Sequence, residues 1–248
     1  MSYIIINNVS KSYNNKKIIE NLNVNIEKGK FVSFVGAYGT GKTTLLKMLA
    51  GIENIDEGNI LIGGCSPEVL KKNRKIGFAF QHHMLLPWRN VINNILLPCQ
   101  LNKNKDIKEA ERLLKLVGLE EKKFCYLSEL SGGMQRIVSI LRAIILKPSI
   151  LLLDEPLSAI DEINRDDLHE KLIEIHNQNG QTTILVTHSI HEAVYLSDEV
   201  YIMGESPAKI IKKICPKNPR IKSEKFSSET MENVALIRKE LREVIKNA

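Results

Sequence analysis

A glycine-rich segment with one lysine offers the clearest chemistry in this sequence. It reads GAYGTGKT at residues 36–43 and fits the phosphate-loop pattern of glycine, four residues and Gly-Lys-Ser/Thr. Its glycines let the backbone curl so that successive N–H groups point at phosphate oxygens. Lys42 can reach the β- and γ-phosphates, and the Thr43 hydroxyl can ligate Mg²⁺. The segment is predicted to bind a nucleoside triphosphate. A chance match in a tight turn is the alternative, with a frequency on the order of one per cent.

Two adjacent carboxylates follow an apolar run. Residues 150–153 read ILLL, which is typical of a buried strand, and lead directly into Asp154 and Glu155. The carboxyl end of a parallel strand is the edge at which ligands bind, so Asp154 is predicted to hold Mg²⁺, directly or through water. Glu155 projects differently and could accept a proton from an attacking water. A turn or helix cap is the alternative for such a pair, and the phosphate loop in the same chain argues against it.

A second anion-binding segment reads LSGGMQR at residues 130–136. A serine followed by two glycines at the start of a helix makes an N-terminus that favours anions. One nucleotide does not need two such termini from one subunit. We therefore expect this terminus to close over the γ-phosphate bound by a partner chain. A plain helix N-cap is the alternative for this segment on its own.

Alternating strand and helix patterns must position these residues. Strands are predicted at 3–9, 18–26, 31–35, 60–62, 150–153 and 182–187, and helices at 44–50, 106–117 and 166–177. Strands separated by helices favour a largely parallel sheet. Towards the end of the chain, a helical face is expected to pack on its own domain; it comprises Met231, Val234, Ile237, Leu241 and Val244.

Composition is ordinary for a soluble globular protein, with 43% hydrophobic and 26% charged residues among 248. No apolar run approaches the ~20 residues that span a bilayer, and the N-terminus has no signal-peptide pattern. The four cysteines, at 65, 99, 125 and 215, are expected to be reduced, buried thiols of a cytosolic protein. The net charge of +6 equals the basic surplus of residues 206–248, a tail that could touch nucleic acid or lipid but that we interpret as a solvated surface.

Over essentially its whole length, the chain resembles the ATPase subunit of ABC transporters. The matching motifs are GAYGTGKT at 36–43, FAFQ at 78–81, LSGGMQ at 130–135, ILLLDEP at 150–156, SAID at 158–161 and TH at 187–188. The resemblance implies an α/β P-loop NTPase with a RecA-like parallel-sheet core, a small antiparallel β subdomain and an α-helical signature subdomain. Within one domain, 1–248, the core and β subdomain would occupy 1–82 and 148–205, the helical subdomain 83–147 and a C-terminal extension 206–248.

The same resemblance implies roles for individual residues. ATP would be bound by Tyr13, stacked on adenine, and by Gly36, Gly39, Thr40, Gly41, Lys42, Thr43 and Thr44. Mg²⁺ would be held by Thr43, Gln81 and Asp154. Glu155 would be the catalytic base, assisted by Lys42, by His188 at the γ-phosphate and by Gln81 at the metal or the lytic water. Ser131, Gly132 and Gly133 would complete the opposite site, and Asp161 would bridge the dimer.

A narrower resemblance, to ATPases of nitrate, sulfonate and taurine importers, lies in QHHMLLPW at 81–88 and EAVYLSD at 192–198. It implies an ATP-hydrolysing subunit that energises uptake of a small solute, with a thiamine precursor also possible. The implied partners are a second copy of the chain, two integral membrane permease subunits and, indirectly, an extracytoplasmic solute-binding protein, without nucleic acid. The location would be peripheral, at the cytoplasmic face of the cell membrane. Trp88 would lie near the cleft for the membrane subunit, with core packing as an equal alternative.

The chain departs from the family pattern at two places. Tyr38 replaces a small hydroxyl residue, although its side chain can point to solvent, and Arg136-Ile137 follows LSGGMQ where the family continues Gln-Arg. Two other functions compete. A soluble ABC ATPase of repair or translation would carry tandem cassettes or long insertions, which this chain lacks. A non-hydrolysing partner in a heterodimer would not keep Lys42, Asp154, Glu155 and His188 intact.

Overall fold

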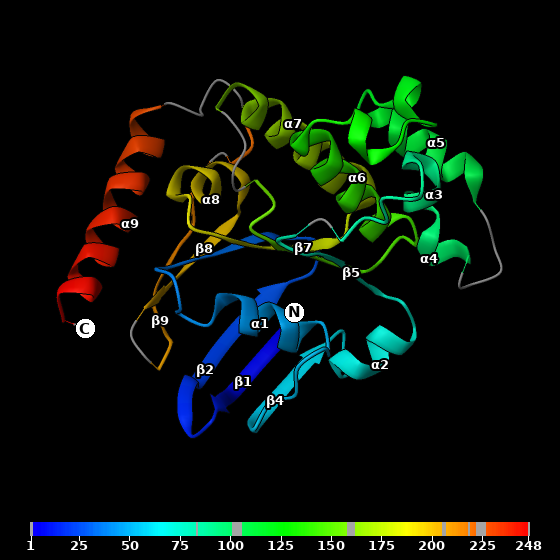
Figure 1. Cartoon of the computed structure of the whole chain (residues 1–248). Coiled ribbons are helices and arrows are strands. Elements are labelled where there is room, and N and C mark those ends of the chain that lie inside the picture. Colours follow the sequence, from blue (N-terminus) through cyan, green and yellow to red (C-terminus); the bar gives the residue numbers. More distant parts are fainter. Residues whose placement is uncertain are drawn as a thin grey trace. The chain divides into compact units, whose positions relative to one another are not determined.

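The computed structural model describes residues 2–82, 84–100, 106–157, 162–204, 207–217, 219–221 and 227–247, without the side chains of 162–164 and 244–247. The chain has the predicted α/β fold, with parallel strand pairs and a small antiparallel sheet (Figure 1). It divides into two compact units: unit 1 comprises Met1–Asn73 and Thr182–Ala248, and unit 2 comprises Arg74–Gln181. The functional subdomain boundaries given above stay a prediction. None of the helices described combines the length and apolarity needed to cross a membrane.

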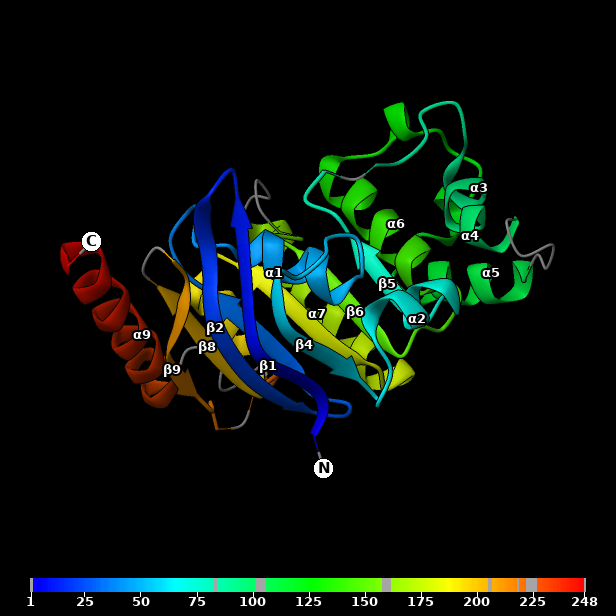
Figure 2. The same ribbon diagram turned by 90° about the horizontal axis from the view of Figure 1, so that it is seen from below.

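Unit 1 begins with an antiparallel sheet of β1 (Ser2–Tyr13), β2 (Lys16–Glu27) and β4 (Glu57–Ile62), in the order β2-β1-β4 (Figure 2). Every second residue near the end of β2 is buried, which is the alternation expected of a sheet with one covered face. Asn14 and Asn15 close the β1–β2 hairpin with φ of 48° and 63°, the backbone conformation that suits a two-residue turn.

A second group of strands in unit 1 runs in the order β7 (Thr182–Thr187), β3 (Phe31–Val35), β8 (Glu199–Gly204) and β9 (Lys209–Ile214). β3 is parallel to both β7 and β8, and β9 is antiparallel to β8. The pairs run in register from Phe31 with Thr183 to Val35 with Thr187, so β3 and β7 end at the same edge. Both strands are buried throughout, as their mainly apolar and β-branched sequences predict.

The described part of unit 1 contains the helices α1 (Lys42–Leu49), α2 (Pro67–Lys72), α8 (Ile190–Leu196) and α9 (Ser228–Asn247). α9 packs against α8 and β8 (Figures 1 and 2 show its course along this side of unit 1). Val234 and Ile237 are buried there against α8 and β8, and Leu241 is partly buried. The expectation that this face packs on its own domain is confirmed for these three residues. Met231 at its edge is 40% exposed, and the side chain of Val244 lies outside the described part.

Unit 2 pairs β5 (Ile76–Ala79) with β6 (Ile150–Asp154) in parallel. Its helices are α3 (Val91–Ile95), α4 (Leu97–Gln100), α5 (Ile107–Leu116), α6 (Gly132–Ile144) and α7 (Glu162–Asn179), with short 3₁₀ turns at Glu120–Lys122 and Leu127–Glu129. α6 packs closely on β5: a Cβ at Gly77 would lie 2.4 Å from the carbonyl oxygen of Ala143.

The expectation of buried cysteines is wrong for part of the set. Cys99 is buried in α4 and Cys125 is half-buried, but Cys65 and Cys215 are exposed. The exposed pair lies where strands end: Cys65 follows a Gly-Gly turn after β4, and Cys215 is the residue directly after β9. Loops at strand ends lie on the surface, so a small apolar side chain there is not drawn into the core.

Asp198 ties the start of β8 to the start of β3 and to the C-terminal region. Its Oδ2 accepts the N–H of Phe31 at 2.8 Å, and Arg220 Nη2 donates to Oδ1 at 2.6 Å. Burial raises the pKa of this carboxyl, but the hydrogen bonds from Arg220 and Phe31 together with the nearby positive charge outweigh it, and the net pKa is lowered. A carboxyl with a lowered folded-state pKa stabilises the fold above its unfolded pKa and loses that contribution as pH falls below about 4.

We expect Asp198→Asn to lower the free energy of unfolding by about 1.5–3 kcal/mol at pH 7, the range for a hydrogen bond to a charged group. The difference from the wild type should shrink as pH is lowered towards 3, because the wild-type carboxyl then becomes neutral as well. Chemical unfolding at several pH values measures this. Asp167→Asn is the matched control, since Asp167 is 63% exposed in its pair with Lys171 and should change little. A difference that does not vary with pH would contradict the account.

Candidate functional site

The phosphate loop of unit 1 connects β3 to α1. A Cβ on Gly36 would lie 2.4 Å from the carbonyl oxygen of Met203, so only glycine fits there. Gly41 caps α1 with φ of 75°, a left-handed conformation that glycine adopts without strain, and Gly39 turns the loop with φ of 80°. The close approach at Gly36 and the positive φ angles of Gly39 and Gly41 therefore explain why the loop has glycine at these three positions.

The loop and the start of α1 favour a bound anion. The first turn of α1 is fully described and contains no acidic residue, so its backbone N–H groups and the helix dipole favour an anion. Lys42 is 7% exposed, and its Nζ donates to Gly36 O at 2.9 Å, Ala37 O at 2.7 Å and Thr40 Oγ1 at 3.2 Å. Thr40 Oγ1 in turn donates to Ala37 O at 2.8 Å. The loop is thus wrapped around a buried ammonium group, an arrangement that fits a polyphosphate.

Tyr13 lies at the end of β1 and reaches α1. Burial, followed by the neighbouring Glu53 carboxylate, raises the pKa of the Tyr13 hydroxyl, which also shares a hydrogen bond with Thr44. Lys11 Nζ lies 5.1 Å from the centroid of the Tyr13 ring and pairs with Glu53 at 3.0 Å. The ring is 39% exposed. The structure thus brings the predicted adenine-stacking residue to the first turn of α1, where Thr43 and Thr44 lie.

His188 emerges beside the loop because β3 and β7 end together. It follows Thr187, the register partner of Val35. The Thr187 hydroxyl donates to the Glu192 carboxylate and accepts the N–H of Ser189 at 3.0 Å, which fixes the turn into α8. Tyr38 stacks on the imidazole of His188, with ring centroids 5.9 Å apart and planes inclined by 27°. Tyr38 is 79% exposed, as expected for a side chain that points to solvent, but its contact with His188 was not foreseen.

In unit 2, the structure brings Gln81 to the predicted catalytic carboxylate. Gln81 Nε2 donates to Glu155 Oε2 at 3.1 Å. Asp154, the last residue of β6, and Glu155 are 3% and 8% exposed. Glu155 has φ of 45°, a left-handed conformation that is uncommon outside glycine and turns its side chain away from the strand direction. The different projection of the two adjacent carboxylates stays a prediction.

Arg136 is a site residue that sequence reasoning missed. It lies on α6, is 6% exposed, and its Nη1 donates to the carbonyl oxygens of Phe80, at 3.4 Å, and Gln81. Burial lowers its pKa, opposed by the negative charges of Glu155 and Asp154. A guanidinium thus holds the backbone that carries Gln81. One signal in the sequence points to it: an arginine stands at the position where the family pattern is broken.

The signature segment begins α6. Ser131 is the N-cap, and its Oγ accepts the N–H of Met134 at 3.3 Å. Ser131 and Gly132 are exposed, and a Cβ on Gly132 would meet no atom within 4 Å. The serine therefore acts as a helix cap in this structure, and the role of the segment towards a partner's phosphate stays a prediction. Asp161 and the SAID motif at 158–161 lie outside the described residues, as does His83.

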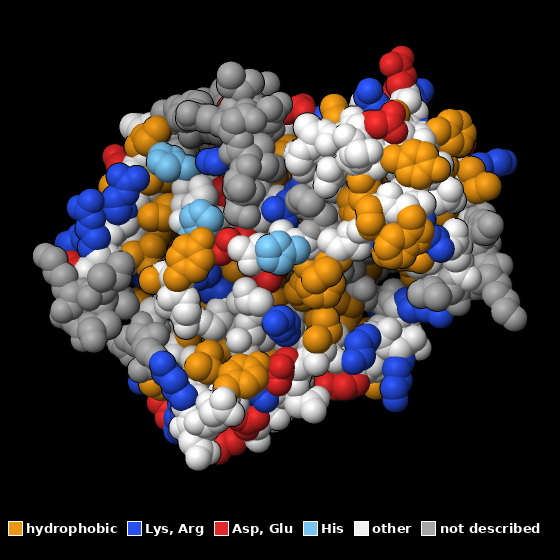
Figure 3. All heavy atoms as spheres, in the orientation of Figure 1, with side chains coloured by type: hydrophobic (Ala, Val, Ile, Leu, Met, Phe, Trp, Pro, Cys, Tyr) orange, Lys and Arg blue, Asp and Glu red, His pale blue; other side chains and the backbone are white. Residues whose placement is uncertain are grey.

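Trp88 is 71% exposed, so the alternative of core packing is wrong. It belongs to an exposed aromatic patch of unit 2 that also contains Phe124, 69% exposed, and Tyr126, 51% exposed. The loops that carry these residues lie side by side, because Asn90 pairs with Tyr126 and the N–H of Val91 donates to Cys125 O at 2.9 Å. Figure 3 shows hydrophobic side chains gathered over the part of unit 2 that contains α3 and α5.

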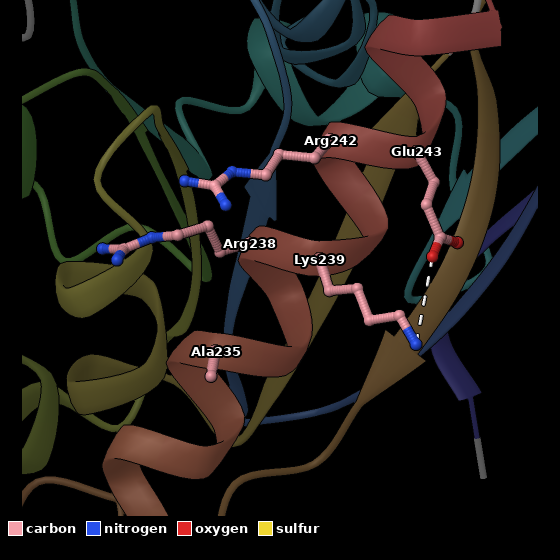
Figure 4. A pocket seen from close by; sticks show the side chains of 5 residues that line it. All are labelled: Ala235, Arg238, Lys239, Arg242 and Glu243. Atoms are coloured by element: carbon pink, nitrogen blue, oxygen red, sulfur yellow. Dashed lines mark ion pairs between the residues drawn. The ribbon is translucent and has the colours of Figure 1, made fainter.

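A separate shallow hollow lies on α9 (Figure 4). It is lined by Ala235, Arg238, Lys239, Arg242 and Glu243. Arg238 and Arg242 extend in the same direction, while Lys239 pairs with Glu243 at 3.9 Å. Lys and Arg side chains gather over this helix in the space-filling view (Figure 3). The hollow contains none of the predicted nucleotide-binding residues.

The residues present fit Mg²⁺ as part of a nucleotide complex. Among the described side chains, no group of three or more His, Cys, Asp or Glu could hold a metal alone. Mg²⁺ prefers one or two protein oxygens together with substrate phosphates and water. The Thr43 hydroxyl and the buried Asp154 carboxylate are ligands of this kind.

Comparison with known proteins agrees with this geometry. The ABC transporter family profile matches residues 19–158. The aliphatic sulfonates import ATP-binding protein SsuB of Bacillus cereus is 42% identical over 91% of this chain and 90% of its own length. The spermidine/putrescine import ATP-binding protein PotA of Fusobacterium nucleatum is 44% identical over 79% of this chain and 54% of its own length. A dimeric structure of the ATP-binding cassette MJ0796 in a post-hydrolysis state, bound to ADP and phosphate, has a TM-score of 0.76 and 28% identity, and the match covers 87% of this chain and 99% of that one.

The chain belongs to the ABC transporter family, as its ATP-binding, ATP-hydrolysing component. The predicted P-loop NTPase fold and the predicted ATPase activity are thereby confirmed. The roles of single residues stay predictions, which the contacts described above make specific enough to test.

Proposed function

We propose that this chain is the ATP-hydrolysing subunit of an ABC importer and energises uptake of a small solute through partner membrane subunits. The observation that carries the proposal is the hydrogen bond between Gln81 and Glu155 at the end of β6, in a chain whose phosphate loop wraps Lys42. This hydrogen bond orients the Glu155 carboxylate beside Gln81, and the side-chain amide of Gln81 can also bind a metal ion or a water molecule. The import names of the relatives support the direction of transport.

In unit 1, the proposal assigns nucleotide binding to the phosphate loop. Lys42 exchanges its hydrogen bonds with loop carbonyls for charge-assisted bonds to the β- and γ-phosphate oxygens. The N–H groups at the start of α1 bind the same anion, and Tyr13 offers one face of its ring to adenine. His188 contacts the γ-phosphate.

In unit 2, Glu155 acts as the general base. Its carboxylate accepts a proton from the attacking water, while the amide of Gln81 keeps the accepting oxygen oriented. Thr43, Gln81 and Asp154 would hold Mg²⁺, which when bound neutralises negative charge on the phosphates. Arg136 holds the backbone of Gln81 in place from α6.

A second copy of the chain completes the site in this proposal. Its Ser131, Gly132 and Gly133 close over the γ-phosphate with the N–H groups at the start of α6. The exposure of Ser131 and Gly132 leaves that terminus available, and the solved cassette cited above is dimeric. Closing and reopening of the pair would drive the permease subunits, because the closed form binds ATP more tightly than ADP.

The aromatic patch of Trp88, Phe124 and Tyr126 is proposed to contact the membrane subunit. Large aromatic side chains contribute disproportionately to protein interfaces, and three of them here are more than half exposed. Trp88 lies seven residues after Gln81 in the sequence, so the proposed interface and the residue that contacts Glu155 belong to one short segment. The chain would then be peripheral, at the cytoplasmic face of the membrane, with an extracytoplasmic solute-binding protein as an indirect partner.

We expect Trp88→Ala to remove most of the ATPase stimulation by the permease, about tenfold or more if Trp88 is a hot spot of that interface. ATP hydrolysis by the isolated chain should stay unchanged, because Trp88 is not among the residues predicted to bind or hydrolyse the nucleotide. Reconstituted complexes in nanodiscs measure both rates. Ile52→Ala, which truncates a 50% exposed side chain of unit 1, is the control. Full stimulation in Trp88→Ala would remove the patch from the proposed interface.

Two other functions remain distinguishable by experiment. Tight, salt-sensitive binding to DNA or RNA would favour a soluble ABC ATPase of repair or translation. ATP binding without hydrolysis, even with the permease present, would favour a non-catalytic partner of a heterodimer. For the solute, we infer a sulfonate, nitrate or taurine type, with a thiamine precursor also open, since the narrower resemblance and the SsuB relatives agree. Ligand binding by the cognate solute-binding protein tests this.

A further inference from the structure

The stack of Tyr38 on His188 joins the phosphate loop to the turn after β7. Tyr38 replaces the small hydroxyl residue of the family pattern, so this contact depends on the particular sequence of this chain. The rings are nearly parallel, with planes inclined by 27° and centroids 5.9 Å apart, which is within the range of attractive aromatic pairs.

Both backbones under the stack are held by hydrogen bonds. On the loop side, Ala37 O accepts from Lys42 Nζ at 2.7 Å and from Thr40 Oγ1 at 2.8 Å. On the other side, the Thr187 hydroxyl accepts the N–H of Ser189. The two segments start from paired residues at the ends of β3 and β7, so their separation is set by the sheet.

An exposed histidine at the end of a strand has several accessible χ1 rotamers, and only some direct its imidazole towards the phosphate loop. A ring that stacks on the imidazole in one rotamer raises the population of that rotamer at the expense of the other rotamers. Because small misplacements of a group that contacts the reacting phosphate are costly in rate, such a bias would change turnover more than nucleotide affinity.

We propose that Tyr38 is a positioning residue that holds the imidazole of His188 at the phosphate loop. The inference rests on the proposed role of His188 at the γ-phosphate. Tyr38, which lies outside the family pattern, would act through His188. This action needs the aromatic ring of Tyr38 but not its hydroxyl.

Kinetics of three variants test the proposal. Tyr38→Ser should lower the kcat for ATP about three- to tenfold, the rate equivalent of losing one aromatic pair, with the Kd for ATP within about twofold. Tyr38→Phe should keep the wild-type kcat, because the ring is retained. In a His188→Ala background, Tyr38→Ser should cause no further loss. An unchanged kcat in Tyr38→Ser, or an equal loss with and without His188, would overturn the proposal.

Nuclear magnetic resonance of the histidine ring protons gives a readout that does not need turnover. The signals of His188 are assigned by their disappearance in His188→Ala, and the ring current of Tyr38 should displace them. Tyr38→Ser should remove that displacement, and Tyr38→Phe should keep it. The same spectra of Glu155→Gln with Mg-ATP should still show it, and its loss on nucleotide binding would exclude a positioning role. A wild-type chain that never hydrolyses ATP would instead refute the proposed function, and these spectra would then decide the stack alone.

Discussion

Replacing Glu155 with glutamine is expected to lower the turnover number for ATP by about two orders of magnitude or more, the upper part of the range for loss of a general base. ATP binding should remain, because Glu155 is not among the residues predicted to bind phosphate. Glutamine has nearly the same shape, and its side-chain oxygen can still accept the hydrogen bond that Gln81 Nε2 donates at 3.1 Å. The substitution thus removes the proton-accepting charge and leaves the contact.

The measurement compares single-turnover hydrolysis with equilibrium binding of ATP in the presence of Mg²⁺. Glu174→Gln is the control, since it makes the same chemical change at an exposed position of α7 in the same unit. Saturation with Mg-ATP should also favour dimers of Glu155→Gln, which light scattering detects. Normal turnover in Glu155→Gln would remove Glu155 from the role of base.

Replacing Lys42 with alanine is expected to weaken ATP binding about tenfold to a hundredfold, which corresponds to one or two hydrogen bonds between charged groups. The loss should include turnover, because the same ammonium group would bind the γ-phosphate. The alanine variant also removes the ammonium donor from Gly36 O, Ala37 O and Thr40 Oγ1, of which Ala37 O keeps the hydrogen bond from the Thr40 hydroxyl. A small decrease in stability without nucleotide is therefore expected as well.

Calorimetric titration with ATP and thermal unfolding with and without Mg-ATP separate these two effects. A wild-type chain should gain thermal stability as ATP is added, since the ligand binds the folded state. Lys42→Ala should gain much less. Lys47→Ala, on the same helix but in its last turn, should behave like the wild type. Equal ATP affinity in Lys42→Ala and the wild type would contradict the assignment of the phosphate loop.

The parts of the site that follow from local sequence could be predicted. Apolar runs predicted β3 and β7 at their exact bounds, Phe31–Val35 and Thr182–Thr187, because a buried parallel strand needs little beyond its own composition. The phosphate loop is likewise local, since its glycines, its lysine and the following helix are consecutive.

Contacts between distant segments could not be predicted in this way. The bonds from Arg136 to the carbonyls of Phe80 and Gln81 depend on where α6 lies against β5, which no short stretch specifies. The stack of Tyr38 on His188 depends on the register of β3 with β7. The exposure of Trp88 depends on a loop whose neighbour, around Tyr126, is remote in sequence.

The backbone at Gly36 passes so close to the carbonyl of Met203 that the two positions differ in the substitutions they tolerate. At Gly36 any side chain collides, so variation is forbidden. At Met203 the colliding atom belongs to the main chain, and the side chain is free to vary as far as this gap is concerned. A displacement of the end of β8 would press directly on the loop that carries Lys42. Substitutions in the core beneath β8 can therefore change nucleotide affinity or turnover, although the substituted residues contact no residue of the site.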